Sequence, residues 1–176
     1  MKGAFFEAAV HHGIFGDALA AFEKANHIMR GQPGSEASAM VFGEFFPNPG
    51  SHPLTGETGV RMSVWRAFGA EVMGTAILLL VIFCATHERN EARPQVLTAA
   101  TIGLTVTLLI SLLAPLTMAC FNPARDLSPR LFSSLAGWGA VPFVVTGSGW
   151  LTVYVLAPVV GGLLGGGAYR FFFKTG

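Results

Sequence analysis

The sequence predicts an all-α membrane protein, and three observations carry that prediction. Of the 176 residues, 52% are hydrophobic and only 12% are charged, whereas soluble domains carry roughly 25% charged residues. Charged residues are absent from three long runs, 72–86, 94–124 and 131–169. Alone or with its flanks, each run can supply the about 20 apolar residues of a membrane-spanning helix. The 22 glycines favour close packing between such helices.

The composition also excludes several classes of protein. A formal net charge of +1 provides no field that would attract nucleic acid, and the apolar content is too high for a disordered chain. The two cysteines cannot form a disulfide scaffold, and their spacing suggests no metal site. No HExxH, GxSxG or Walker pattern occurs, so we expect no enzyme, no metal and no cofactor.

The charge pattern places the spans in order along the chain. The first begins beside Trp65 and Arg66, which are typical of the membrane interface, and the second ends before Pro115. A stretch rich in Gly, Ser and Pro precedes the third and is interpreted as a loop. The predicted spans cover residues 64–86, 95–113 and 150–172.

The N-terminal region is less apolar. Residues 3–22 carry Glu7, His11, His12 and Asp17, and charges in the middle of a span are costly, so this stretch predicts only a partial span. We interpret the histidines as interface or loop-proximal residues rather than ligands. Residues 23–63, with their PGS, PNPGS and TGETG clusters, predict a long exposed loop. The positive-inside rule does not decide the orientation, because basic residues lie on both sides.

The most informative motif is NPARDLSPRLF, which starts at Asn122 directly after an apolar run. Asn is a favoured N-cap and Pro a favoured first helical residue, so a helix is predicted over 122–133. That helix is too short to cross a bilayer and would be re-entrant. Arg125 lies in its first turn, where the helix dipole disfavours a cation, which indicates a role other than helix stability. The alternative is a chance N-cap in a surface loop.

This motif resembles the second Asn-Pro-Ala motif of the major intrinsic protein (aquaporin) family, most of all its aquaglyceroporin or glycerol facilitator branch. RAFGAEVMGTAILL, GLTVTLLISLLAPLT and APVVGGLLGGGAYR resemble the family's fourth, fifth and sixth spans, and GAFFEAAVHHGIFGDALAAFE resembles its third. The resemblance covers about residues 3–173. It implies an aquaporin-like right-handed helical bundle that is incomplete here: a C-terminal portion with three to four spans and one re-entrant half-helix.

The resemblance also implies roles for individual residues. In the family, a half-helix dipole and an arginine at a constriction form a barrier to cations and protons. Ala119 stands where glycerol channels usually have an aromatic residue, and Ile110 where they have Gly and water channels have His, so the preference between glycerol and water stays open. The implied pore residues are Asn122, Pro123 and Ala124, the implied selectivity-filter residues are Arg125, Ala119 and Ile110, and the implied loop supports are Glu71 and Asp126.

The implied function is passive conduction of glycerol, other small neutral solutes and water once the missing N-terminal half completes the channel. The alternative is a truncated, non-conducting paralogue, or an interaction subunit of a full channel. By resemblance the protein is a multi-pass protein of the plasma or inner membrane and a homotetramer, with the lipid bilayer around it, glycerol and water as permeants, and no nucleic acid partner.

Overall fold

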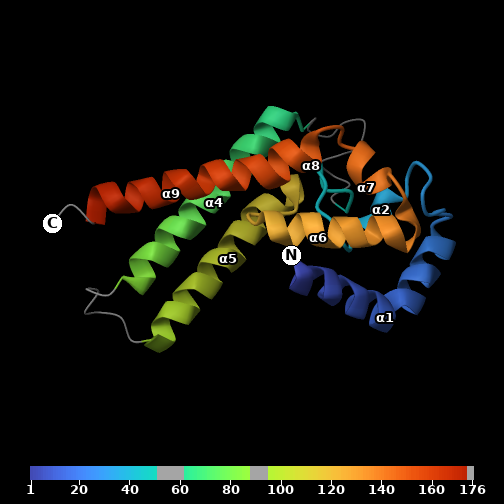
Figure 1. Cartoon of the computed structure of the whole chain (residues 1–176), viewed down its shortest axis with the longest axis horizontal. Coiled ribbons are helices and arrows are strands. Elements are labelled where there is room, and N and C mark those ends of the chain that lie inside the picture. The colour runs from blue at the N-terminus through green and yellow to red at the C-terminus, as the bar shows by residue number, and fades with distance from the viewer. Residues whose placement is uncertain (51–61, 88–94, 174–176) are drawn as a thin grey trace.

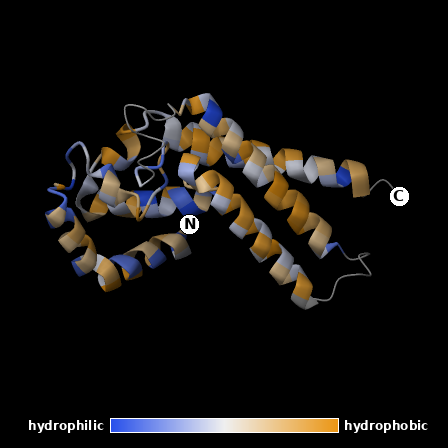
Figure 2. Ribbon diagram, turned by 180° about the vertical axis from the view of Figure 1, so that it is seen from behind, coloured by the Kyte–Doolittle hydropathy of each residue, from blue (hydrophilic) through white to orange (hydrophobic). Residues whose placement is uncertain are grey.

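Helices make up the regular structure of the protein (Figure 1). The computed structural model describes residues 1–50, 62–87 and 95–173, and within them it contains helices and no strand. Three helical segments are long and apolar enough to cross a membrane: Val64–Thr86, Leu97–Thr117 and Gly149–Phe173. Figure 2 shows hydrophobic residues along much of the length of all three. The prediction of an all-α membrane fold is therefore confirmed.

The tightest helix pair consists of α4 (Val64–Thr86) and α9 (Ala157–Phe173), which cross each other in Figure 1. Gly161 and Gly165 of α9 are buried in this crossing. A Cβ atom at Gly165 would lie 2.4 Å from the carbonyl oxygen of Ala76, and one at Gly161 would lie 2.5 Å from that of Val72. Only residues without a side chain allow the two backbones to approach this closely.

The helix α5 (Gln95–Thr117) packs beside α4 and extends beyond residue 113, where the sequence placed the end of the span. Pro115 lies inside its last turn, a position where proline usually interrupts a helix. The last turn is held from outside the helix. Asn48 Nδ2 donates a 2.9 Å hydrogen bond to Ala114 O, and the Tyr154 hydroxyl donates a 3.1 Å bond to Thr117 O.

The short helix α6 (Pro123–Ser133) follows α5 after a non-helical segment. It continues into a π-helical turn, η1 (Ser134–Trp138), and a further short helix, α7 (Val141–Val144). The sequence interpretation of residues 131–149 as a loop is therefore wrong in part, because glycine-rich segments can also form tight helical turns. The chain reverses at Gly137 and Gly139, both with positive φ. It then enters the last span through α8 (Gly149–Leu151) and the π-helical turn η2 (Thr152–Leu156).

The first helix, α1 (Lys2–Ala25), packs along α6 and is not among the three membrane-span candidates of the described residues. The segment that follows it contains the short helix α2 (Glu36–Ala39). The prediction of an exposed loop over residues 23–63 is wrong for residues 42–46, which are buried. Phe42 and Phe45 share a core with Ala8, Ala39 and Trp138, so aromatic packing outweighs the polar composition of the segment.

The crossing of α4 and α9 yields a stability prediction. Gly165→Ala should lower the melting temperature in detergent because its methyl group meets the Ala76 carbonyl, and overpacking of this kind costs about 1–3 kcal/mol. Gly167→Ala, in the same helix with no atom within 4 Å of the new Cβ, should leave it unchanged or raise it, because Ala favours helix over Gly. Equal melting temperatures for the two variants would contradict this packing.

Candidate functional site

The segment between α5 and α6 has an unusual backbone conformation. Met118, Ala119 and Phe121 have φ values of 62°, 56° and 53°, in the left-handed region. Each such non-glycine residue costs of order 1–3 kcal/mol. The segment follows an apolar span directly, where backbone polar groups must find partners within the protein or in a water-filled cavity. Specific interactions therefore have to hold this segment in place.

The carboxylate of Glu71 supplies the first set of these interactions. Glu71 lies on α4 and is fully buried. Its Oε1 accepts hydrogen bonds from the Thr117 hydroxyl at 2.6 Å and from the Cys120 N–H at 3.0 Å, and its Oε2 accepts one from the Phe121 N–H at 2.7 Å. One carboxylate thus binds the end of α5 and two backbone N–H groups of the left-handed segment. The structure brings together Glu71 and the loop it was expected to support.

The guanidinium of Arg125 binds the carbonyl side of the same segment. Its NH1 donates to Ala119 O at 2.7 Å and to Cys120 O at 3.3 Å. Although Arg125 lies in the first turn of α6, its side chain reaches back over the preceding residues. These carbonyl oxygens offset part of the unfavourable position of a cation at a helix N-terminus. Nearly half of the side chain, 47%, remains exposed.

Asn122 begins α6. Its backbone is extended at φ −151°, and its Oδ1 accepts a 3.0 Å hydrogen bond from the Ala124 N–H. Pro123 occupies the first helical position, as the motif predicted. Among the described residues, no hydrogen bond is formed by the amide nitrogen of Asn122. The cap therefore fixes the side chain while leaving a donor at an exposed position.

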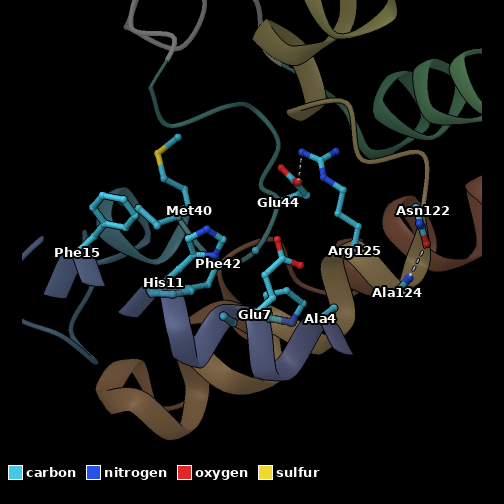
Figure 3. A pocket seen from close by; sticks show the side chains of 14 residues that line it. Ala4, Glu7, His11, Phe15, Met40, Phe42, Glu44, Asn122, Ala124 and Arg125 are labelled. Carbon is cyan, nitrogen blue, oxygen red and sulfur yellow. Dashed lines mark hydrogen bonds and ion pairs between the residues drawn. The ribbon is translucent and has the colours of Figure 1, made fainter. Parts of the chain in front are cut away.

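Two cavities meet at Asn122 and Arg125. One, of about 590 Å³, is lined by these two residues together with Glu7, His11 and Glu44 (Figure 3). The other, of about 600 Å³, is lined by the same pair together with Ile110, Ala119 and several apolar residues of α4 and α5. The structure thus brings the four residues Asn122, Arg125, Ala119 and Ile110 to the lining of one cavity, which shares Asn122 and Arg125 with the other.

Asp126 and Arg130 lie one turn apart on α6 and are fully buried. Asp126 Oδ1 and Oδ2 accept hydrogen bonds from Arg130 at 2.7 and 2.9 Å, and Oδ1 also accepts the Glu44 N–H at 2.7 Å. Arg130 donates further bonds to the carbonyl oxygens of Glu44 and Pro142. A buried ion pair is tolerated only when its remaining polar atoms are satisfied. Here the backbone N–H and carbonyl oxygen of Glu44 satisfy several of those atoms, and residue 44 is thereby anchored to α6.

Glu44 is a site residue that the sequence analysis missed. Its side chain is buried, and Oε1 lies 3.0 Å from Arg125 NH2 in an ion pair. Burial raises the pKa of Glu44 to about 7, although the charge of Arg125 opposes the shift. The local signal was a single glutamate between Phe42 and Phe45, since a carboxylate among large apolar side chains has to find a partner. The partner itself lies 81 residues further along the chain and has no signature in the local sequence.

The Glu71 contacts lead to a second stability prediction. Glu71→Gln retains the shape but offers one carbonyl oxygen to three donors, so a buried N–H should lose its partner at a cost of about 1–3 kcal/mol. We expect a lower melting temperature in detergent. Glu36→Gln, which alters a carboxylate bonded to the Gly34 N–H near the surface, serves as the control and should change it little. A melting temperature for Glu71→Gln as high as that of the control would show that these contacts are dispensable.

The chain is similar to curated channel proteins over nearly its whole length. It is 37% identical to the glycerol uptake facilitator protein of Pseudomonas aeruginosa over 97% of this chain and 57% of that protein. It is likewise 37% identical to aquaporin-9 of Mus musculus over 99% of this chain and 54% of that protein. The chain therefore spans little more than half the length of the curated relatives it matches.

The fold has a counterpart among solved structures. The X-ray structure of the aquaglyceroporin from Plasmodium falciparum matches with a TM-score of 0.67 and 22% identity, covering 98% of this chain and 59% of that one. At this identity the likeness shows the fold, and it supports the aquaporin-like arrangement of the helices. The sequence pattern of the family described as "Major intrinsic protein" matches residues 3–169. This multi-pass membrane chain therefore belongs to the major intrinsic protein family, whose members are channels and facilitators rather than enzymes.

Proposed function

We propose that the chain forms part of a passive channel for glycerol, other small neutral solutes and water, with the solute path running past Asn122 and Arg125. The observation that carries the proposal is that two cavities share these two residues in their linings. A continuous path needs such a meeting point. The names of the relatives, glycerol uptake facilitator and aquaporin-9, support the solute class.

The chemistry of the cavity beside α5 suits a polyol. One wall is apolar and includes Leu78, Val106 and Ile110, while the opposite wall carries Asn122 and Arg125. A glycerol molecule has a hydrocarbon edge and a hydroxyl edge, so it can contact both walls at once. In this proposal the Asn122 amide and the Arg125 guanidinium donate to hydroxyl oxygens, the Ala119 position sets the width of the constriction, and Ile110 forms part of the apolar wall.

Charge at the same point would exclude cations. The N-terminus of α6 carries roughly half a positive charge, and Arg125 adds a guanidinium beside it. A positive constriction of this kind is the known barrier to protons and cations in aquaporin-type pores. Pro123 and Ala124 shape the helix start, and Glu71 and Asp126 hold the segments on either side of it.

A second candidate function is kept beside the channel. Folds of this kind place the site between two inverted repeats, and this chain spans 54–57% of the curated relatives described above. The first candidate therefore includes a second portion, in the same product or in another chain. The second candidate is a non-conducting subunit that packs against a full channel. A homotetrameric assembly in the plasma or inner membrane belongs to the first candidate.

Permeability of vesicles distinguishes the two candidates. The longest product of the gene that contains this chain is reconstituted into liposomes, and the chain of 176 residues is reconstituted separately. The channel proposal predicts that the former raises glycerol permeability at least tenfold above that of empty liposomes in stopped-flow measurements. If both preparations equal empty liposomes, the channel proposal fails and the non-conducting candidate is favoured.

The role of Arg125 is tested in the same product. Arg125→Ala should raise permeability to larger polyols and to methylammonium at least threefold relative to glycerol, because the constriction becomes wider and loses its charge. Arg66→Ala, at an exposed arginine in the first turn of α4, is the matched control and should keep the parent solute profile. An unchanged profile in Arg125→Ala would remove Arg125 from the filter.

A further inference from the structure

The buried carboxylate of Glu44 faces the cavity that Asn122 and Arg125 line, as Figure 3 shows. Its side chain is 9% exposed, while that of Arg125, its ion-pair partner at 3.0 Å, is 47% exposed. The pair therefore has one member that solvent and solute can reach and one that is shielded. A shielded carboxylate acts mainly through the charge it places beside its partner, because at short range in a protein that interaction is stronger than in water.

The backbone of Glu44 is fixed to the helix that carries Arg125. The Glu44 N–H donates to Asp126 Oδ1 at 2.7 Å, and the Glu44 carbonyl accepts from Arg130. The next residue, Phe45, is buried and donates its N–H to Met118 Sδ at 3.2 Å. Residue 44 thus has two anchors on α6 and a neighbour tied to the left-handed segment. The backbone hydrogen bonds of residues 44 and 45, as well as the ion pair itself, therefore hold the carboxylate against Arg125.

The surroundings of Glu44 leave Arg125 as its direct counter-charge. The buried Asp126 carboxylate and Arg130 guanidinium, both on α6, balance each other. The carboxylate of Glu71 on α4 accepts hydrogen bonds from the Thr117 hydroxyl and from two backbone N–H groups of the segment before α6. Glu7 and His11 of α1 line the same cavity but are exposed to solvent. With Glu44 ionised, its charge offsets part of the positive charge that a solute meets at Arg125 and the α6 N-terminus, and with Glu44 neutral that positive charge is not offset.

We propose that Glu44 tunes conduction through the channel: its carboxylate offsets part of the charge of Arg125 at the solute path and so sets how tightly that arginine holds a passing solute. The inference rests on the proposed function. Conduction requires binding that is weak enough for the solute to leave. An arginine without its counter-charge attracts hydroxyl and water oxygens more strongly, so solutes leave it more slowly.

The proposal predicts a pH dependence with a definite sign. Burial raises the pKa of Glu44 to about 7. Above that pH the carboxylate is ionised and offsets the charge of Arg125. As the pH falls through 7, Glu44 takes up a proton and Arg125 loses its counter-charge. Glycerol permeability should therefore fall at least threefold between pH 8 and pH 6.

The test compares three forms of the longest product that contains the chain, each reconstituted into liposomes and assayed by stopped-flow at pH 6 and pH 8. Glu44→Gln keeps the size of the side chain but holds it neutral, so its glycerol permeability should be the same at both pH values and equal to that of the parent at pH 6. His11→Gln is the control, because His11 lines the same cavity. It should keep the pH profile of the parent.

The results separate the role of Glu44 from the channel function itself. If the parent conducts but shows no pH dependence, or if Glu44→Gln retains that dependence, the assignment of Glu44 is overturned while the channel function stands. If the dependence disappears in His11→Gln instead, the assignment of Glu44 is likewise overturned. If the parent does not exceed empty liposomes at either pH, the proposed function itself fails, and the inference falls with it. Glu44→Asp, which restores the charge, should recover the pH profile and so separates loss of charge from misfolding.

Discussion

The hydrogen bonds between the Glu71 carboxylate and the N–H groups of Cys120 and Phe121 determine the rest of the site. They compensate a backbone conformation that non-glycine residues rarely adopt. Once the N–H groups are bound on the α4 side, the carbonyl oxygens of Ala119 and Cys120 are available to Arg125. A single buried acid thereby fixes the register in which α5 ends and α6 begins. The tight crossing of α4 with α9 in turn fixes the position of that acid.

A second acid organises the other side of α6. Asp126 binds the Glu44 N–H as well as Arg130, and Arg130 binds the Glu44 carbonyl. The loop that carries Glu44 and the segment that carries Ala119 are thus both attached to the first two turns of one short helix. The geometry around Arg125 consequently depends on α6 as well as on the Glu71 carboxylate of α4. This explains why so polar a helix carries two fully buried charges.

Much of this arrangement could be predicted from the sequence, because the signals are local. The charge-free runs gave the spanning helices, and Asn122-Pro123 gave the start of α6. The family resemblance pointed to Glu71 as a support of the loop before α6. The course of residues 42–46 and the place of Glu44 could not be predicted, because they depend on contacts between segments far apart in the sequence. The polar, proline-rich composition of this segment does not reveal that Phe42 and Phe45 anchor the segment in a buried core. The helical turns of 134–144 were missed for a related reason: glycine permits both loops and tight turns.

The groups before α6 that accept hydrogen bonds from Arg125 are backbone carbonyl oxygens. The space beside the arginine and the hydrogen bonds that hold it can therefore change independently of each other. The carbonyl oxygens of residues 119 and 120 remain in place whatever side chains stand there, provided that Glu71 holds the segment. A larger side chain in place of Ala119 would therefore change the space beside the arginine while preserving its acceptors. The space beside Arg125 can therefore change through a single substitution, while the backbone acceptors that hold its guanidinium stay the same.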